Sequence, residues 1–344
     1  MSGLHGIPSS QWPDFLTSTD PGSWAADPLG EDFEHTTLNL GVDGEGPVLG
    51  TLVRYVPKQP PPGNPEERGI LLSVHGWSDY FYNRELAEFW RAAGYRFYAL
   101  DLRRYGRSLR SEHQRPGYVE HLAEYHQELD AAAELLTAEH TGLPLLVQGH
   151  SLGGLISSLW AQQSTAKLAG LVLNAPWLEF QGTQFLRIPA QGLMEAMARR
   201  SPTRTLHLPE LDHYWLSLSQ DGHGEWDIHP LWRPRHAFRP TVGWMRTVLE
   251  AHAKVAKGLD LELPVLVLTS AQSHFGASYD PLMQRTDSVV DVNLVRQRSL
   301  KLGSFVTNAI ITDAMHDVFT SSAGPRAESY AKVRRWLHLL QGAS

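Results

Sequence analysis

The chain of 344 residues contains no cysteine. Disulfides, a thiol nucleophile and thiolate metal ligands are therefore excluded, although this absence does not fix the cellular compartment. Lysine and arginine together number 30 against 37 for aspartate and glutamate, which gives a formal net charge of −7. Because a surface that binds nucleic acid needs an excess of positive charge, we expect no nucleic acid partner.

Long apolar runs are also lacking. No run reaches the length of a membrane-spanning helix, and the N-terminal residues show no basic stretch followed by an apolar core, as a signal peptide would. We therefore expect no integral membrane segment and a cytoplasmic location. Hydrophobic residues make up 42% of the chain and charged residues 19%, a balance typical of a globular protein. The composition does not indicate the oligomeric state.

Short apolar segments alternate with amphipathic ones along most of the chain. Strands are expected at residues 33–40, 48–56, 69–74, 95–100, around 145, 168–174, 263–269 and 308–311, and helices at 83–93, 116–140, 152–160 and 326–340. The first two strands are separated by a Gly-rich turn and are predicted to form a hairpin. The remaining alternation predicts the α/β class, with a mainly parallel central sheet covered by helices on both faces.

Residues 176–262 interrupt this rhythm. They contain no apolar strand run, yet they hold five of the 11 tryptophans. We expect helices and loops inserted between two strands, so that a core built from residues 1–175 and 263–344 carries a cap. The cap's apolar residues, which include its tryptophans, fit two roles equally well: covering an acyl chain or burying the cap against the core. They include Phe185, Leu186, Leu193, Met194 and Met197.

The most specific local pattern is Gly-His-Ser-Leu-Gly at residues 149–153, where an apolar strand ends and a helical pattern begins. A serine at such a junction lies on a tight, strained turn that pushes its hydroxyl clear of the sheet. The flanking Gly149 and Gly153 suit this turn because they lack a Cβ atom. The helix that starts after Ser151 offers free N–H groups to a developing anion. On its own, the pentapeptide also fits a Gly-rich turn with no catalytic role. The other residues that a serine nucleophile requires must therefore distinguish the two interpretations.

A serine nucleophile needs a histidine base, a carboxylate and N–H donors for the oxyanion. The sequence HGWSDYFY follows an apolar strand, and its turn can bring the N–H of Trp77 over the nucleophile, with the N–H of Leu152 as the second donor. Alternatively, His75 and Gly76 only form a tight turn. His316 is the candidate base among 17 histidines, because it follows the last expected strand and precedes the final helix.

The carboxylate is harder to place. After the strand at 263–269, no acidic residue occurs before Asp280. We favour Asp287, which opens a turn leading into a helix and is displaced by an insertion of roughly a dozen residues beyond the usual short loop. Asp291 is the runner-up, although it fits equally well as the N-cap of that helix. Asp280 comes third, and Asp317, beside the base, is expected to be structural.

These motifs resemble the α/β-hydrolase superfamily, in particular the branch of monoacylglycerol lipases, lysophospholipases and small bacterial esterases with a helical cap. The matching segments are HGWSDY at 75–80, DLRRYGRS at 101–108, GHSLGG at 149–154, PVLVL at 264–268 and MHD at 315–317. The resemblance covers roughly residues 33–175 and 260–340 and implies an α/β-hydrolase fold. It also implies a triad of Ser151, Asp287 and His316, with Trp77 and Leu152 as oxyanion donors.

Two positions depart from the pattern of that family. Ser78 stands where the family has the second glycine of H-G-x-G, and Ser273 or a neighbour stands at the usual position of the acid. The first departure could alter the oxyanion loop. The second leaves the acid assignment resting on the displaced Asp287.

The leading functional hypothesis is a serine hydrolase of carboxylic esters, acting on lipid-like or small acyl esters without a cofactor. A peptidase of the same fold, similar to proline aminopeptidases, is the alternative and would need cap carboxylates to hold a substrate amine. The candidates for that role are Glu195, Glu210, Glu225 and Asp227. A third reading is a binding protein on an inactive hydrolase scaffold. The cap histidines match no metal-ligand spacing, so we expect no metal.

Overall fold

The computed structural model describes residues 8–20, 22–59, 66–180, 192, 194–209 and 211–341. Within these residues, nine strands form one sheet in the order β1-β2-β3-β5-β4-β6-β7-β8-β9. The strands are β1 (Ala25–Ala26), β2 (Phe33–Asp43), β3 (Gly46–Tyr55), β4 (Gly69–Val74), β5 (Tyr95–Asp101), β6 (Leu145–His150), β7 (Leu168–Asn174), β8 (Val265–Ser270) and β9 (Val306–Ile311).

The sheet is parallel from β5 through β4 and β6 to β9, and antiparallel at its β1, β2 and β3 end. The expected hairpin of β2 and β3 and the expected mainly parallel sheet are therefore confirmed. The inner parallel strands are largely apolar on both sides because both faces of the sheet are covered there, whereas β9 at the edge is partly exposed. In β4, for example, Leu72 belongs to the core on one face and Leu71 to the core on the other.

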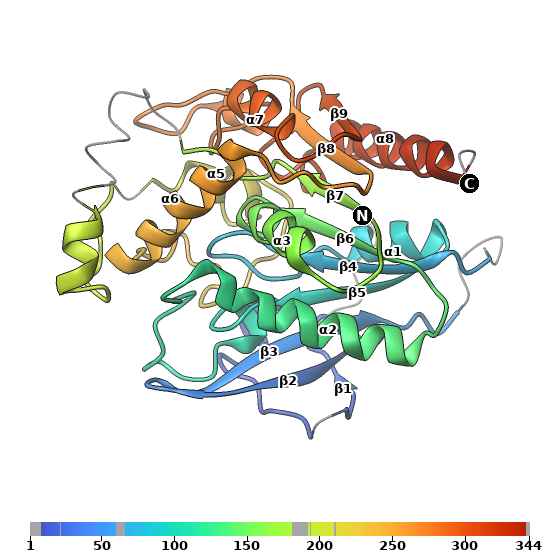
Figure 1. Ribbon diagram of the computed structural model, residues 1–344, viewed down its shortest axis with the longest axis horizontal. Helices are drawn as coiled ribbons and strands as arrows, with labels where there is room; N and C mark the ends of the chain where they lie inside the picture. The colour runs from blue at the N-terminus through green and yellow to red at the C-terminus, as the bar shows by residue number, and fades with distance from the viewer. Residues whose placement is uncertain are drawn as a thin grey trace.

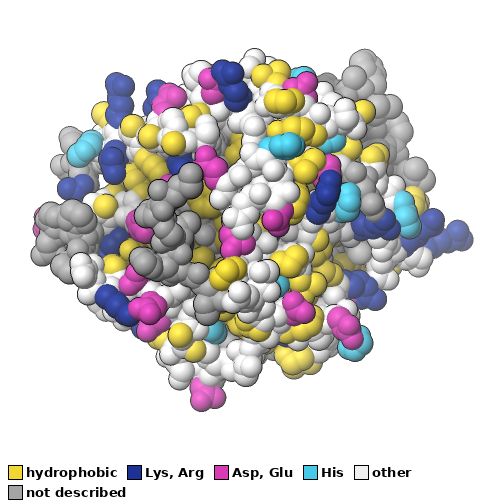
Figure 2. All heavy atoms as spheres, turned by 180° about the vertical axis from the view of Figure 1, so that it is seen from behind, with side chains coloured by type: hydrophobic (Ala, Val, Ile, Leu, Met, Phe, Trp, Pro, Cys, Tyr) yellow, Lys and Arg dark blue, Asp and Glu magenta, His cyan; other side chains and the backbone are white. Residues whose placement is uncertain are grey.

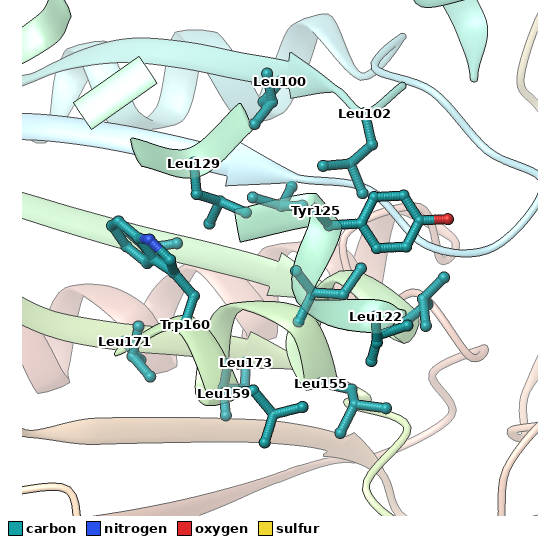
Figure 3. Packing of buried hydrophobic residues seen from close by; sticks show 14 of the residues in the cluster. Leu100, Leu102, Leu122, Tyr125, Leu129, Leu155, Leu159, Trp160, Leu171 and Leu173 are labelled. Atoms are coloured by element: carbon teal, nitrogen blue, oxygen red, sulfur yellow. The ribbon is translucent and has the colours of Figure 1, made fainter. Parts of the chain in front are cut away.

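Helices cover both faces of the sheet (Figure 1). Their bounds are α1 (Arg84–Ala92), α2 (His126–Glu139), α3 (Leu152–Gln163), α5 (His213–Leu218), α6 (Val242–Lys257), α7 (Val292–Ser299) and α8 (Ala323–Gln341), with short 3-10 turns at Ser9–Gln11, Gly106–Ser108, Leu122–Tyr125 and Pro281–Gln284. Trp90 of α1 and Trp336 of α8 share one buried cluster. Leu129 of α2 and Leu155 of α3 belong to the cluster on the other face, part of which is seen in Figure 3.

One expected helix is shorter than the sequence indicated. Residues 116–140 were expected to be helical throughout, but regular helix begins only with the 3-10 turn at Leu122 and α2 follows it. Gly117 adopts a positive φ of 62°, and a Cβ atom there would lie 2.2 Å from the hydroxyl of Tyr105. Its carbonyl also accepts a hydrogen bond from the hydroxyl of Tyr125 (2.6 Å). The chain is thus fixed in a turn at a point where helical dihedral angles are not available.

The segment between β7 and β8 leaves the alternating pattern, as expected, and carries α5 and α6 on the left of the sheet in Figure 1. It shares the core of the sheet, because Trp244 and Val248 of α6 belong to the same buried cluster as Leu155. Phe185, Leu186 and Leu193 lie outside the described residues, whereas Met194 packs against this cluster.

Two features of the structure bear on the expectations from charge and hydropathy: the mixture of side chains on the surface, and the length and apolar character of the helices. On the face shown in Figure 2, acidic, basic and hydrophobic side chains are interspersed. Among the helices that the structure describes, none combines the length and the apolar character needed to cross a membrane.

A buried ion cluster fixes the turn that follows β5. The Arg107 guanidinium donates hydrogen bonds to Asp27 (2.6 and 2.8 Å) and to Asp101 (2.9 Å), and all three side chains are fully buried. Burial by itself raises the pKa of Asp27, but the charge and hydrogen bonds of Arg107 outweigh it and hold that pKa well below its usual range. The segment DLRRYGRS therefore serves structure, with Arg107 joining the N-terminal region to the core.

Replacing Arg107 by alanine is expected to lower the free energy of unfolding by about 3–5 kcal/mol, because two carboxylates remain buried without their partner. Arg115→Ala is the matched control: it breaks an ion pair with Glu45 in which the Arg115 side chain is 48% exposed, so less than about 1 kcal/mol should be lost. Urea unfolding of both variants measures the difference. Equal losses would show that the buried cluster does not stabilise the fold.

Candidate active site

Ser151 lies at the junction of β6 and α3 in a conformation that serine rarely adopts. Its φ is 50° and its ψ is −114°. Such a backbone persists only where the surroundings hold it. The Ser151 N–H donates to the carbonyl of Asn174 (3.0 Å), and the Ser151 carbonyl accepts from the N–H groups of Trp177 (3.0 Å) and Gly154 (3.0 Å). The turn is therefore tied to the end of β7 and to the first residues of the inserted segment.

The glycines around Ser151 are required by close backbone approach. A Cβ atom on Gly149 would lie 2.6 Å from the carbonyl oxygen of Gly153, and one on Gly153 would lie 2.3 Å from the carbonyl oxygen of His75. Both contacts are with backbone, which cannot move aside as a flexible side chain can. The loop after β4 thus packs directly against the turn that carries the serine.

His316 follows β9 and lies beside this turn. Its ring centroid is 4.9 Å from that of His150, the residue before Ser151. Its Nδ1 is 2.8 Å from Oδ2 of Asp287, and both side chains are almost completely buried, at 2% and 0% exposure. A carboxylate at this distance makes Nδ1 the protonated nitrogen, so Nε2 carries the lone pair. Among the described residues, Nε2 has no hydrogen-bond partner.

The structure describes all of the acidic candidates. Asp287 is the only one of them that hydrogen-bonds to His316. Its other carboxylate oxygen accepts the N–H groups of Val289 and Val290, both at 2.8 Å. Asp291 instead caps α7 by accepting from the N–H groups at 293 (2.9 Å) and 294 (3.3 Å), which is the second role that its sequence position suggested.

The two remaining acids also serve local structure. Asp280 accepts the N–H of Leu282 (2.8 Å) at the start of a 3-10 turn, and its side chain is 51% exposed. Asp317 accepts the N–H of Phe319 (2.9 Å) and the side-chain amide of Asn174 (2.5 Å). The structural role expected for Asp317 agrees with these bonds.

Although Asp287 is displaced along the sequence, the fold brings it back beside the end of β8. Residues 274–286 loop out just beyond the carboxyl end of β8 and return, so that Ser273 and Asp287 form a parallel β-bridge. The Asp287 N–H donates to the carbonyl of Gln272 (3.0 Å), and the His274 N–H donates to the carbonyl of Asp287 (2.9 Å). Asp287 therefore lies next to Ser273, the position where the resemblance places an acid. We call residues 274–286 the strap.

The loop after β4 is held by its own histidine and by the inserted segment. His75 accepts the N–H of Leu102 at Nε2 (3.0 Å), so its Nδ1–H donates to the carbonyl of Gly76 (2.7 Å). A Cβ atom on Gly76 would be 3.2 Å from the Cβ of Ser151. Trp77, between Gly76 and Ser78, is thus carried close to the turn that holds Ser151. Leu152 is the first residue of α3, where an N–H has no partner within the helix.

Ser78 retains the backbone that a glycine would supply at this point. Its φ is 52°, in the left-handed region that favours glycine. The hydroxyl of Ser78 accepts the N–H of Phe238 (3.1 Å), and the indole N–H of Trp77 donates to the Phe238 carbonyl (3.1 Å). The departure from the H-G-x-G pattern therefore preserves the loop conformation and adds a tie to the inserted segment.

A cavity of about 500 Å³ opens next to Ser151. Its lining is aromatic and aliphatic apart from Ser151 and the exposed side chains of His236 and Arg239, and none of the residues described in it is acidic. The lining residues are Trp77, Ser151, Trp177, Phe180, Leu206, Leu208, Pro209, Leu211, His236, Ala237, Phe238, Arg239, Pro240, Trp244, Met245, Val289 and Val290.

Asn174 is a site residue that the sequence analysis missed. Its carbonyl accepts the Ser151 N–H, its side-chain oxygen accepts the N–H of Val318 (3.1 Å), and its side-chain amide donates to Asp317. One residue thereby fixes the turn of the serine to the turn of His316. The sequence does offer one sign of this role: Asn174 is a single amide at the end of the apolar run LAGLVLN. A polar side chain that is buried with such a run needs hydrogen-bond partners.

Nearby groups are kept in defined charge states. Burial lowers the pKa of His150, although the charge of Asp317 opposes this, so His150 is neutral over a wider pH range than an exposed histidine. Burial also acts to lower the pKa of Arg233, but its ion pair with Asp79 dominates and holds that pKa well above the usual range. Within the described residues, no three potential ligands gather as a metal site would require.

The comparison with protein families agrees with this geometry. The family profile described as serine aminopeptidase S33 matches residues 65–320. The match spans most of the chain, and the chain therefore belongs to this family of α/β-hydrolase serine hydrolases. The resemblance inferred from the sequence motifs is confirmed.

Two curated relatives match a shorter segment. Phospholipase YtpA of Bacillus subtilis is 32% identical over 114 residues, which are 33% of this chain and 42% of that protein. The monoacylglycerol lipase of Mycolicibacterium smegmatis is 28% identical over 112 residues, or 32% of this chain and 39% of that protein. The matched segment thus spans about two fifths of the length of these relatives.

Solved structures share the fold over most of the chain. A soluble variant of monoglyceride lipase from Saccharomyces cerevisiae superposes with a TM-score of 0.64 at 18% identity, covering 88% of this chain and 94% of that one. The monoacylglycerol lipase of Paleococcus ferrophilus gives a TM-score of 0.59 at 21% identity, covering 80% and 96%. The chain is a lipase- and esterase-like α/β-hydrolase in its architecture.

Introducing a side chain at Gly153 should disrupt the candidate site. We expect Gly153→Ala to lower the free energy of unfolding by about 2 kcal/mol or more, because its Cβ would overlap the backbone of the loop after β4. Gly44→Ala is the control, since no atom lies within 4 Å of a Cβ at that position, and it should stay within about 0.5 kcal/mol of the parent. Chemical unfolding compares the two, and a neutral Gly153→Ala would contradict the close packing of turn and loop.

Proposed function

We propose that this protein hydrolyses carboxylic esters with Ser151 as nucleophile, His316 as general base and Asp287 as the acid that orients the base. One observation carries the proposal. His316 is buried beside a strained serine turn, its Nδ1 bound to a buried carboxylate at 2.8 Å while its Nε2 has no partner among the described residues. An imidazole held in this way has Nε2 placed to act as a general base.

The proposed reaction has two steps. His316 Nε2 takes the proton of the Ser151 hydroxyl as the oxygen attacks the ester carbonyl carbon, and the oxyanion is held by the backbone N–H groups of Trp77 and Leu152. The intermediate collapses, the bond to the alcohol breaks, and His316 gives its proton to the leaving oxygen. Water then attacks the acyl-enzyme, with His316 as base, and releases the carboxylic acid and free Ser151. Neither step needs a cofactor.

The cavity supports an acyl ester with an apolar chain. Its aromatic and aliphatic walls adjoin Ser151, and such walls favour burial of hydrocarbon. Two relatives named phospholipase and monoacylglycerol lipase, and structural neighbours named monoglyceride lipase and carboxyl esterase, agree with this choice. We therefore favour lipid-like acyl esters, with smaller esters as poorer substrates.

A peptidase activity is less well supported by the residues that the structure describes. An aminopeptidase needs a carboxylate in the pocket to bind the substrate amine, and the described lining contains none. Glu225 contacts an arginine of α8 and Asp227 an N-terminal serine, while Glu195 is exposed and pairs with an arginine one turn further on. Glu210 lies outside the described residues. The esterase reading is therefore preferred, although the family description names an aminopeptidase.

An inactive binding protein on this scaffold is disfavoured because the site costs stability. Such a protein has no need for a buried histidine bound to a carboxylate beside a strained serine, because burying these groups and bending the backbone both cost stability.

We further propose that residues 176–262 act as a cap over the cavity and that residues 1–175 and 263–344 form the hydrolase core. The cavity lining agrees with this division, since most of its residues come from the segment between β7 and β8.

The nature of the reaction is tested by Ser151→Ala. Wild-type protein should hydrolyse p-nitrophenyl esters, with kcat/KM rising as the acyl chain lengthens, and Ser151→Ala should lose at least about 10³-fold in kcat because the nucleophile is removed. Aminoacyl p-nitroanilides are assayed in parallel. Ester hydrolysis that survives in Ser151→Ala would contradict the mechanism, and cleavage of the anilides alone would favour the peptidase.

The choice of acid is tested by two matched amide substitutions. Asp287→Asn should lower kcat by about 10³- to 10⁴-fold, because an asparagine side chain can reverse the donor and acceptor roles and stabilise the wrong tautomer of His316. Asp291→Asn should keep activity within a few-fold, since asparagine caps helices as well as aspartate does. Steady-state ester kinetics separate the two, and a larger loss in Asp291→Asn would overturn the assignment.

A further inference from the structure

The inserted segment places one aromatic ring directly against the proposed base. Tyr214 lies on α5, and its ring centroid is 5.4 Å from that of His316 at an interplanar angle of 85°, an edge-to-face contact. Asp287, bonded to Nδ1 of His316, and the ring of His150 also contact the imidazole. Tyr214, unlike these two, belongs to the segment between β7 and β8.

Tyr214 is itself held by a buried ion pair. The guanidinium carbon of Arg233 lies 5.1 Å from the centre of the Tyr214 ring, and the same guanidinium pairs with the Asp79 carboxylate. The side chains of this pair are only 7% and 6% exposed. Arg233 also donates to the hydroxyl of Tyr82 (3.3 Å). A cation in this place has little freedom to move, because leaving its partner would strand a buried carboxylate.

The helix that carries Tyr214 is fixed by the strap. The His213 ring lies 3.2 Å, through Nε2, from the carbonyl of Gly276, and the ring of His223, beyond the end of α5, stacks on Tyr279 with centroids 4.5 Å apart. Asp287, the residue that bonds to His316, directly follows the strap. The strap therefore fixes both the carboxylate of Asp287, on one side of the imidazole, and the helix that carries Tyr214, on another side.

These contacts connect two parts of the proposed machinery that are distant in sequence. Asp79 lies two residues after Trp77, in the loop proposed to hold the oxyanion, and Tyr214 contacts the base. Arg233 joins them through its ion pair and its position over the ring. The imidazole is thus contacted by the inserted segment as well as by Asp287.

We propose that Tyr214 is a positioning residue: its ring, clamped by the Arg233–Asp79 ion pair, holds the His316 imidazole in the orientation that directs Nε2 toward Ser151. This inference rests on the proposed function. An edge-to-face contact restricts the rotation of the imidazole, and a small misplacement of a catalytic group can cost about 10²-fold in rate. The ring, and not the hydroxyl, is the part that makes this contact.

The test compares three substitutions at Tyr214. Tyr214→Phe keeps the ring and should retain kcat within about threefold, whereas Tyr214→Ala should lose about 10- to 100-fold in kcat with KM changed less than about threefold. Tyr214→Leu fills apolar volume without a ring and should fall with the alanine variant, which secures the test if Tyr214→Ala does not fold. Trp215→Ala is the matched control, because it removes a neighbouring ring of α5 that lies over Arg235 and should leave kcat unchanged.

A spectroscopic readout makes the test independent of turnover. The far-downfield proton resonance of His316 Nδ1–H reports the bond to Asp287, and it should stay sharp in wild-type and Tyr214→Phe but broaden in Tyr214→Ala and Tyr214→Leu. A sharp resonance and unchanged kcat without the ring would overturn the proposal, as would a Tyr214→Phe variant as impaired as Tyr214→Ala. Wild-type protein that hydrolyses no ester would contradict the proposed function instead, and the resonance would still decide the role of Tyr214.

Discussion

The site depends on one constraint, the strained backbone of Ser151. A residue with φ of 50° and ψ of −114° stores of order 1–3 kcal/mol, and it keeps that conformation only if its neighbours leave no alternative. Here they are Gly149 and Gly153, packed against each other and against the loop after β4, and Asn174, which receives the Ser151 N–H. The rigid ends of the strands hold the turn in place, and the turn presents the hydroxyl of Ser151.

The remaining parts of the site are tied to this turn by buried polar contacts. Asn174 links it to the turn of His316, and Asp287, directly after the strap, hydrogen-bonds to the imidazole. Phe238 binds both Trp77 and Ser78, so the inserted segment also holds the loop proposed for the oxyanion. A buried polar group without a partner is costly, so each of these bonds restricts the site to few arrangements. The preorganisation that acyl transfer needs follows from this restriction.

The sequence predicted the sheet well because buried parallel strands are continuous apolar runs. Residues 69–74 and 168–174 are strands with the bounds expected, and the glycines of the serine turn lie where a Cβ would clash. The proximity of Asp287 to His316 also agrees with the local shape of an acid, a turn and a helix start. The helix expected from residue 116 fails because Gly117 and Tyr105 fix a turn, a contact that periodicity does not reveal.

The sequence did not reveal Asn174, Tyr214 or the Arg233–Asp79 pair as parts of the site. Their roles come from contacts between segments far apart in the chain, and the segment between β7 and β8 has no regular period from which a facing surface could be predicted. The most direct test of the account is covalent labelling with a fluorophosphonate, followed by peptide mapping. Labelling should occur on Ser151 alone and slow by orders of magnitude in His316→Ala. Labelling at another residue, or at an unchanged rate in that variant, would contradict the proposed site.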